Sequence, residues 1–518
     1  MSAQFIYCAD ISMWRFEKMN YQSTRDKSIS VSSAQAIKTG LSAEGGLFVP
    51  ESFPTVSIED IKSLISKSYN ERAYFVLSRF LTDFTEEELK ACIDRAYTKE
   101  KFGTESIAPL YKLDNEVYFL ELWHGPTCAF KDMALQILPH LLTTSMKKTN
   151  EDKEIVILVA TSGDTGKAAL EGFKDVSGTR IIVFYPDNGV SEIQKLQMVT
   201  QEGNNVNVAA VKGNFDDAQN GVKKIFTDNE YKSLLERNSF KLSSANSINW
   251  GRLVPQIVYY FSAYAELLKN NDITAGEKIN VVVPTGNFGN ILAAYYAKKM
   301  GLPISKFICA SNENNVLTDF IRTGVYNKNR GFHTTISPSM DILISSNLER
   351  FLYDLTDHDD TVVSNLMKEL NTTGVYEISS DVKQKMQNMF YANYCDDTET
   401  MDTIKKCAEE YDYVIDTHTA VAKSVYDKYI AETGDKTKTV IASTASPFKF
   451  NQSVLIALKD HNAVVGKDEF TLLEELAEES KMQIPKSLYD LKDKSVVFDL
   501  VCNKDEMHQI VSDFLMVE

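Results

Sequence analysis

Cysteine pairs, long apolar runs and a secretory signal are all missing from the sequence. Seven cysteines are scattered over 518 residues without a C-x-x-C pair, which is typical of free thiols in a reducing compartment. The apolar runs fall far short of the roughly 18 residues that a membrane-spanning helix needs. In the first eighteen residues Asp10 interrupts the apolar run and the basic residues follow it, the wrong order for a secretory signal. We therefore expect a cytoplasmic protein with no membrane partner.

Positive charge is also scarce. Lysine and arginine number 55 against 72 aspartates and glutamates, which gives a net charge of −17 and a pI near 5.1. This balance argues against nucleic acid as a partner, because phosphate backbones are bound by clustered basic residues. An anionic small molecule can still bind, but only at a locally basic site.

The signatures of several common ligand sites are absent as well. The sequence contains neither a G-x-G-x-x-G dinucleotide fingerprint nor a P-loop ending in Gly-Lys-Ser/Thr, so nucleotide binding has little support. The seven histidines form no H-x-x-x-H or H-E-x-x-H pair. We therefore expect no metal site.

The residues that are present predict several α/β units. At roughly 100 to 200 residues per domain, the length suggests two to four domains. From about residue 106, short β-branched runs alternate with turn residues and helix formers, which implies βαβ units around mostly parallel sheets. The expected strands are Val117 to Leu120, Ile155 to Ala160, Ile181 to Tyr185, Val206 to Val211, Val281 to Val283, Phe307 to Ala310, Tyr413 to Ile415 and Thr439 to Ser443.

These units predict two open, mostly parallel α/β domains. We expect a larger domain from residues 106–150 and 266–460, with a helical elaboration at about 340–410, and a smaller domain at 151–265. Residues 19–105 are expected to be mostly helical, with one helix starting at Thr85, where Thr-Glu-Glu-Glu resembles a capped start.

The two ends of the chain are interpreted as additions to this framework. Residues 1–18 are expected to be an N-terminal extension, since Met19 could serve equally well as a start. Residues 461–518 alternate acidic and apolar residues at helical spacing, which predicts an acidic helical tail packed on the surface.

One lysine stands at a predicted strand-to-helix junction. Lys131 ends the string Glu121-Leu-Trp-His-Gly-Pro-Thr-Cys-Ala-Phe-Lys131 and precedes the predicted helix Met133 to Leu142. Partial burial beside Phe130 would lower the pKa of its amine and make it able to form a Schiff base. Taken alone, the segment also fits a surface lysine that begins a helix.

Two glycine-containing turns precede predicted helices and suit an anion. They are Thr161-Ser162-Gly163-Asp164-Thr165-Gly166 and Pro284-Thr-Gly286-Asn287-Phe288-Gly289-Asn290, each after an apolar strand. Backbone N–H groups at the positive end of a helix dipole bind carboxylates and phosphates. A plain capped helix and a simple glycine turn are the alternatives.

Two further strings place polar side chains at predicted element ends. The string Ser244-Ala-Asn246-Ser247-Ile-Asn249-Trp-Gly-Arg252 could hold a phosphate with several donors and one fixed positive charge. An ordinary capped helix with a solvent-facing arginine is the alternative. Ser443-Thr444-Ala-Ser-Pro-Phe-Lys449 follows a strand, so its hydroxyls either face the ligand crevice of an open sheet or merely end the strand.

Taken together and in this order, these strings resemble the threonine synthase family of pyridoxal-phosphate (PLP) enzymes, which have the tryptophan synthase β-like fold (fold type II). The similarity is to the bacterial and fungal branch and covers about Met19 to Val454. Supporting strings include NYQSTRD at 20–26 and EGGLFVPE at 44–51.

The resemblance implies PLP as the cofactor and O-phospho-L-homoserine as the substrate, which reacts with water to give L-threonine and phosphate. Lys131 would be the Schiff-base lysine and would move protons during turnover. Thr444 would hydrogen-bond the pyridine nitrogen. The cofactor phosphate would bind at Gly286, Asn287, Phe288, Gly289 and Asn290, the substrate carboxylate at Thr161, Ser162, Gly163, Asp164 and Thr165, and the substrate phosphate at Asn246, Ser247, Asn249 and Arg252.

The sequence departs from the family pattern at one place, and two alternative functions remain to be weighed. Relatives commonly have TAHPAKF where this chain has TASPFKF, so Ser446 and Phe448 put the choice of substrate in doubt. A PLP-dependent phospho-lyase or a serine/threonine dehydratase-like enzyme would release ammonia and a keto acid. A non-catalytic binding protein would require a lost lysine or a broken phosphate loop, and both are intact. We expect a monomer or a homodimer.

Overall fold

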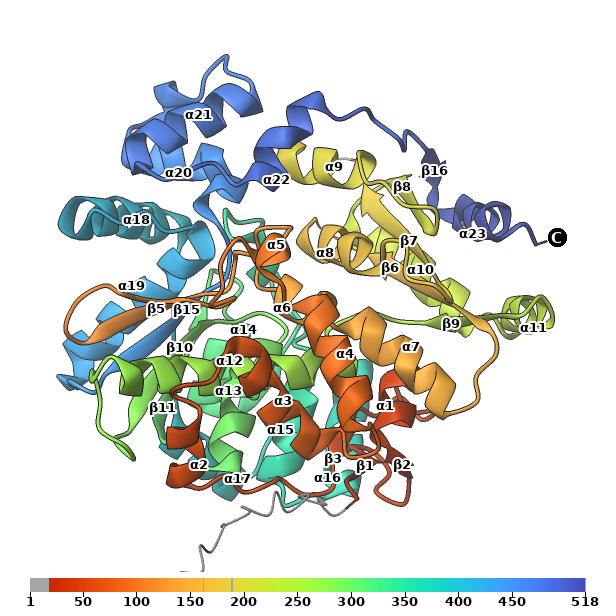
Figure 1. The fold of residues 1–518 in the computed structure, drawn as a ribbon, viewed down its shortest axis with the longest axis horizontal. Coiled ribbons are helices and arrows are strands. Elements are labelled where there is room, and N and C mark those ends of the chain that lie inside the picture. The colour runs from red at the N-terminus through yellow and green to blue at the C-terminus, as the bar shows by residue number, and fades with distance from the viewer. Residues whose placement is uncertain (1–17, 162, 188–189, 518) are drawn as a thin grey trace, which may run out of the picture.

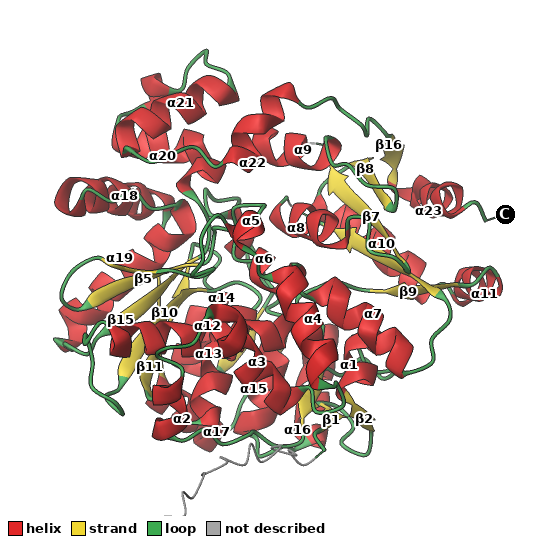
Figure 2. Ribbon diagram, viewed as in Figure 1, coloured by secondary structure: helices red, strands yellow, loops and turns green. Residues whose placement is uncertain are grey.

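Two mostly parallel sheets form the framework of the computed structural model, which describes residues 18–161, 163–187 and 190–517 (Figure 1, Figure 2). The larger sheet has the order β14-β11-β10-β15-β5-β4, and only β4 runs antiparallel to its neighbour. The smaller sheet has the order β16-β8-β7-β6-β9 and is parallel throughout. The predicted α/β class is confirmed.

The bounds of these strands follow the sequence pattern closely, because central strands buried on both faces appear as continuous apolar runs. The larger sheet consists of β4 (Leu110–Lys112), β5 (Val117–Glu121), β10 (Ile279–Pro284), β11 (Ile304–Ser311), β14 (Phe390–Tyr394) and β15 (Thr439–Ser443). The smaller sheet consists of β6 (Glu154–Ala160), β7 (Thr179–Pro186), β8 (Val206–Lys212), β9 (Phe240–Ser243) and β16 (Val501–Asn503).

One predicted strand is wrong. Residues 413–415 form no strand and instead link helices α18 and α19. The ring of Tyr413 stacks on Tyr111 and Phe119, with centroids 4.3 and 5.4 Å apart. Burial against these aromatic rings accounts for the apolar run without a strand ladder.

The N-terminal region contains a small sheet that the sequence pattern did not predict. Strands β1 (Asn20–Ser23), β2 (Ser30–Ser32) and β3 (Phe48–Pro50) pair antiparallel. The rest is helical, and the predicted start at Thr85 is confirmed by a capping box with Glu88. The helices are α1 (Ser33–Thr39), α2 (Ile58–Ser63), α3 (Tyr69–Phe80), α4 (Glu86–Ala96) and α5 (Lys99–Phe102).

The helices of the two α/β parts lie in the expected alternation with strands. The predicted helix at 133–142 is broken in two, with Pro139 in the first turn of the second piece. These helices are α6 (Asp132–Leu135), α7 (Leu138–Lys148), α8 (Asp164–Phe173), α9 (Glu192–Val199), α10 (Phe215–Thr227), α11 (Asn229–Arg237), α13 (Gly289–Met300), α14 (Val316–Thr323), α15 (Leu348–Leu355), α16 (Asp360–Thr372), α17 (Ser380–Met389), α18 (Asp397–Tyr411) and α19 (Thr417–Thr433). A two-stranded antiparallel sheet, β12 (Val325–Asn327) with β13 (Val375–Glu377), belongs to the elaboration.

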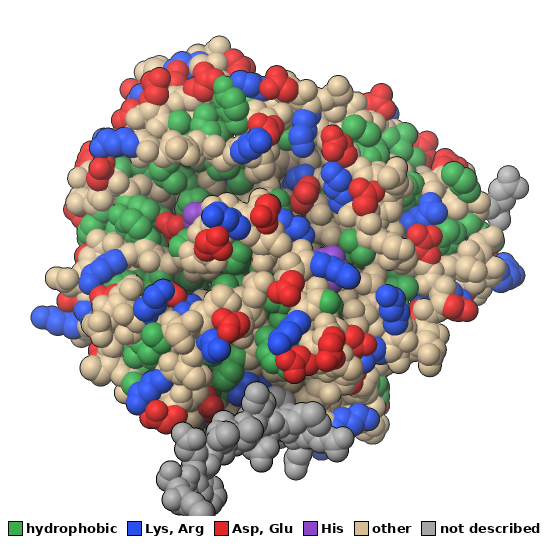
Figure 3. Space-filling view, in the orientation of Figure 1, with side chains coloured by type: hydrophobic (Ala, Val, Ile, Leu, Met, Phe, Trp, Pro, Cys, Tyr) green, Lys and Arg blue, Asp and Glu red, His purple; other side chains and the backbone are tan. Residues whose placement is uncertain are grey.

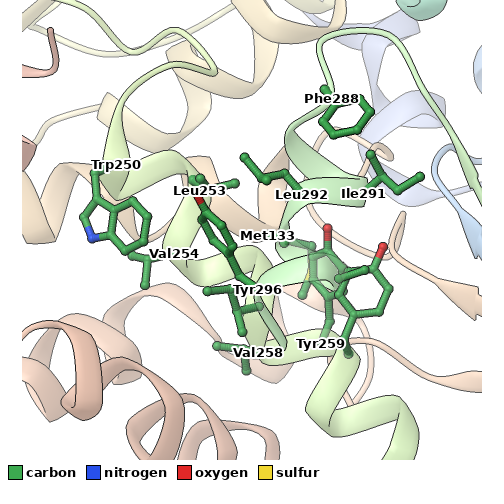
Figure 4. Close-up of a cluster of buried hydrophobic side chains, with 14 of the residues drawn as sticks. Met133, Trp250, Leu253, Val254, Val258, Tyr259, Phe288, Ile291, Leu292 and Tyr296 are labelled. Carbon is green, nitrogen blue, oxygen red and sulfur yellow. The ribbon is translucent and has the colours of Figure 1, made fainter. Parts of the chain in front are cut away.

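Helix α12 (Trp250–Lys269) makes its main contacts with α3, α6 and α13. Its side chains are buried almost all round the helix, which makes it a central helix of the larger core. Figure 4 shows Trp250, Leu253, Val254, Val258 and Tyr259 meeting side chains of α13 in this core.

The C-terminal tail is more than a helical surface layer. It contains α21 (Glu469–Ser480), α22 (Lys486–Tyr489) and α23 (Met507–Leu515), and α20 (Asn451–Leu458) precedes it. Between α22 and α23 the chain crosses to the smaller sheet, where β16 pairs with β8 (Figure 1). Cys502, Met507 and Val511 complete the core on that side. None of the helices in the described part of the chain is long and apolar enough to cross a membrane.

Candidate active site

Two segments more than three hundred residues apart in sequence meet at Lys131. Strands β5 and β15 are neighbours in the larger sheet, and the chain beyond each strand stays paired through a bridge between Ala129 and Ala445. The Phe130 N–H donates to the Thr444 carbonyl at 2.8 Å. The sheet register therefore brings the lysine segment and the predicted pyridine-nitrogen segment together.

The amine of Lys131 lies in a nearly closed polar site. Nζ donates to Asp164 Oδ2 at 3.4 Å and to Ser339 Oγ at 3.0 Å, and the side chain is 12% exposed. Burial lowers the pKa of Lys131, and the cations Lys449 and Arg252 lower it further, while Asp164 opposes them. A lysine with a lowered pKa has more of the free amine that nucleophilic attack requires.

The Asp164 carboxylate contacts four polar side chains of this site. Its Oδ1 binds Lys449 Nζ at 2.6 Å and accepts from Gln194 Nε2 at 3.0 Å, while Oδ2 accepts from Ser339 Oγ at 3.2 Å. Burial alone would raise the pKa of Asp164, but Lys449 and Lys131 hold it well below its usual range. The carboxylate is therefore ionised and fully engaged by its neighbours.

The turn that carries Asp164 is shaped by hydrogen bonds to its first residue. Thr161 Oγ1 accepts from the N–H groups of Gly163 and Gly166 at 3.0 and 2.9 Å. Gly163 has a φ of 133°, and a Cβ there would lie 2.5 Å from Gln194, so only glycine fits. Thr165 is partly exposed at the start of α8, and Ser162 lies outside the described residues.

The glycine turn at 286–290 passes close to the same site. A Cβ on Gly286 would lie 2.9 Å from the carbonyl oxygen of Ser339, so the two segments touch through their backbones. Phe288, labelled in Figure 4, adopts a left-handed φ of 61°, and its ring packs against that of Phe351. Asn287, which precedes it, is exposed.

Asn290 points inward from this turn. Its Oδ1 accepts from the hydroxyls of Tyr259 and Tyr260, and its Nδ2 is buried without a hydrogen-bond partner. Gly289 begins α13.

The string before α12 adopts its predicted capped start, but its arginine is not solvent-facing. Asn249 caps α12 through Gly251 N–H at 2.8 Å and donates to the Ile37 carbonyl at 3.0 Å. Arg252 is 4% exposed and donates to the Ala245 carbonyl at 2.6 Å, while its Nε has no hydrogen-bond partner. Burial lowers the pKa of Arg252 to about 10.

A chain of serine and asparagine contacts links this string to the glycine turn. Ser247 Oγ lies 3.3 Å from Ser346 Oγ, which donates to Asn287 Oδ1 at 3.2 Å. Asn246 is exposed beside them. The structure therefore brings all five predicted segments around one region at the carboxyl ends of the strands.

Comparison with known proteins identifies the family. Models described as threonine synthase N terminus, pyridoxal-phosphate dependent enzyme, and threonine synthase, C-terminal match residues 20–97, 103–445 and 419–510. Threonine synthase of Saccharomyces cerevisiae is 37% identical over 466 residues, which cover 85% of this chain and 89% of that protein. The chain belongs to the threonine synthase family of PLP-dependent enzymes.

Solved threonine synthases share the whole architecture. The PLP-bound enzyme from Brucella melitensis superposes with a TM-score of 0.84 at 34% identity, covering 96% of this chain and 98% of that one. The yeast enzyme gives 0.86 at 33% identity, with coverages of 96% and 99%. Human threonine synthase-like 1 is 43% identical over 437 residues, 82% of this chain, but the chain spans only 58% of the length of that relative.

Several site residues of this threonine synthase family member were missed by sequence reasoning. No residue between Asn290 and Thr444 was predicted as part of the site, yet the short helix Pro338–Met340 places Ser339 against Lys131. The Ser339 N–H donates to His418 Nε2 at 3.1 Å, so His418 Nδ1 carries the hydrogen that faces Asp416 Oδ1 at 3.1 Å. These contacts join residues far apart in the sequence, so no local periodicity could have revealed them.

The departure from the family motif lies behind the site. Ser446 and Phe448 are fully buried, and Phe448 packs in the core of the larger domain. The Ser446 N–H donates to the Cys128 carbonyl at 3.0 Å, which keeps the two segments paired. Lys449, which follows them, still reaches Asp164.

Proposed function

We propose that this chain is a threonine synthase that converts O-phospho-L-homoserine and water into L-threonine and phosphate with PLP. The observation that carries the proposal is that Lys131 lies beside the turns at 161–166 and 284–290 and beside Thr444, at the carboxyl ends of the strands of the larger sheet. The family membership supports the same reaction.

The residues present fit PLP. Lys131 offers a buried amine with a lowered pKa for covalent attachment. The close backbone approach at Gly286, the N–H groups at the start of α13 and the exposed Asn287 would hold the phosphate. Thr444 would meet the pyridine nitrogen. When bound, PLP supplies an electron sink for the carbanion at the substrate α-carbon.

The chain itself would bind the substrate and move its protons. Lys131 Nζ would take the α-proton and return one after water has added. Arg252, with Asn246 and Ser247, would hold the substrate phosphate, because its buried guanidinium keeps an unused donor at Nε. The Asp164 carboxylate is occupied by lysines, so the backbone N–H groups of Asp164 and Thr165 at the start of α8 and the Thr165 hydroxyl would hold the substrate carboxylate.

The test uses Lys131→Ala. In the wild-type chain, borohydride reduction with PLP should leave the cofactor attached to the Lys131 peptide in mass spectrometry, and phosphohomoserine should release phosphate. The Lys131→Ala variant should show neither cofactor attachment at this peptide nor phosphate release. Normal phosphate release by Lys131→Ala would refute the assignment.

A phospho-lyase on the same framework is the second candidate, because Ser446 and Phe448 depart from the family motif. It would use the same lysine and phosphate sites. It would release ammonia and a keto acid in place of threonine, so the products separate the two reactions.

The free, buried cysteines among the described residues support a reducing compartment such as the cytoplasm.

A further inference from the structure

Lys449 is an unusual side chain because a fully buried ammonium group is costly unless it is paired. Its side chain is 0% exposed, and Nζ binds Asp164 Oδ1 at 2.6 Å and donates to the Thr127 carbonyl at 3.0 Å. Thr127 belongs to the loop that ends at Lys131. Lys449 therefore binds both the Asp164 carboxylate, which faces Lys131, and the loop that carries Lys131.

The two oxygens of Asp164 have different partners. Oδ1 receives Lys449 and Gln194, and Oδ2 receives Lys131 and Ser339. The carboxylate thus lies between two ammonium groups, only one of which is exposed at all.

We propose that Lys449 is a positioning residue that acts on Lys131 through Asp164: it neutralises one carboxylate oxygen and fixes the other toward the Lys131 amine. This inference deepens the proposed function and rests on Lys131 as its reactive lysine. The arrangement shares one negative charge between two lysines, so Lys131 can lose its proton more easily than it could from an isolated ion pair.

The charges around Lys131 determine whether its pKa rises or falls when Lys449 or Asp164 is replaced. Asp164 on α8 favours its ammonium form, whereas Lys449 and Arg252 on α12 disfavour it. Asp132 on α6 also faces Lys449. Without Lys449, the whole charge of Asp164 would act on Lys131 and raise its pKa. Without Asp164, only cations would face Lys131 and its pKa would fall.

The experiment measures the reactivity of Lys131 against pH in the full chain. Trace labelling with acetic anhydride, followed by peptide mass spectrometry, reports the free amine without PLP, and the rate of PLP attachment reports it independently. Asp164→Asn should move the midpoint of labelling to lower pH by at least about one unit, and Lys449→Met should move it to higher pH by a similar amount.

Matched variants separate positioning from simple loosening of the fold. Lys449→Arg keeps the charge and should restore a midpoint near that of the wild type. Lys423→Met removes another buried lysine, which pairs with Asp427 at 2.7 Å on α19, and should leave the midpoint unchanged. If Lys449→Met does not fold, Lys449→Gln, which can still donate to the Thr127 carbonyl, carries the same prediction.

Shifts of Asp164→Asn and Lys449→Met in the same direction, or no shift in Lys449→Met, would overturn the proposal. The labelling does not depend on threonine formation. A chain that fails to make threonine can therefore still confirm or refute the role of Lys449.

Discussion

Arg350 joins segments from three parts of the chain beside the candidate site. It is fully buried and donates to the Phe48 carbonyl at 3.0 Å, to Asn347 Oδ1 at 2.5 Å and to the Ile248 carbonyl at 2.6 Å. Asn347 in turn donates to the Asn287 carbonyl at 3.1 Å. The side chain therefore supports the loop that would hold the cofactor phosphate.

Arg350→Met should lower the free energy of unfolding by about 3 kcal/mol, because it leaves three buried acceptors without a donor. Urea unfolding followed by circular dichroism measures this. Exposed Arg237 offers a control, since Arg237→Met should change stability by less than about 0.5 kcal/mol. Equal effects of the two substitutions would contradict this role.

His140 on α7 makes stability depend on pH. Burial, with help from Lys101 and Arg95, lowers its pKa to about 4. A histidine with a depressed folded pKa contributes stability above its unfolded pKa of roughly 6.5, and this is lost as the pH falls toward 4. Between pH 7 and 4.5, the wild type should lose about 2 kcal/mol more than His140→Leu. Parallel pH profiles of unfolding for the two proteins would exclude this contribution.

At the scale of single residues, the sequence motifs predicted site residues only in the connections between a strand and the next helix. Lys131 and Asp164 each lie where the connection from a parallel strand meets the next helix, so their place at the carboxyl ends of the strands could be predicted. The roles of Ser339, His418 and Lys449 depend on contacts between segments far apart in sequence, which leave no trace in local spacing. The burial of Arg252 was likewise invisible, because an arginine after a helix cap is usually exposed.

At the level of elements, α23 and α10 form a tight contact on the smaller sheet. A Cβ on Gly221 of α10 would overlap the sulfur of Met507, which is fully buried. The glycine thus makes room for a side chain of the C-terminal helix. The tail is held to the smaller domain by this contact and by the pairing of β16 with β8.

Met507→Ala should lower the free energy of unfolding by about 2 to 4 kcal/mol through the cavity it leaves. Adding Gly221→Ala should recover about 1 kcal/mol, since alanine favours the helix and fills part of that cavity. Denaturant unfolding of the single and double variants measures both effects. A double variant less stable than Met507→Ala would refute the contact.

Elements with a strong local signal were predictable and those defined by tertiary pairing were not. The central strands were found because burial on both faces gives apolar runs, and the start of α4 because its capping box is local. Strand β16 is only three residues long and exists because it adds to the edge of β8. The contacts of α12 with α3, α6 and α13 were not predictable, because they depend on the core that the helix enters.

At the scale of the whole molecule, the net charge of −17 opposes an anionic substrate. Figure 3 shows acidic and basic side chains interspersed over one face, without a large basic patch. Attraction must therefore come from the buried cations Lys131 and Arg252 and from helix N-termini at short range. Salt screens distant surface charges more than such buried groups.

Raising the ionic strength from about 10 to 150 mM shortens the Debye length from about 30 to 8 Å. The KM for phosphohomoserine should fall about twofold, because long-range repulsion is screened first. Steady-state kinetics over a sodium chloride series measures this. A KM that rises steadily with salt would show that long-range attraction dominates instead.

We propose that this framework makes threonine, and the stoichiometry of the products formed from phosphohomoserine tests this. Threonine is quantified by chromatography, phosphate by a colorimetric assay and ammonia by a coupled enzyme. We predict threonine and phosphate in equal amounts with no ammonia, and neither product with Lys131→Ala. Phosphate released together with ammonia and a keto acid, without threonine, would contradict the claim.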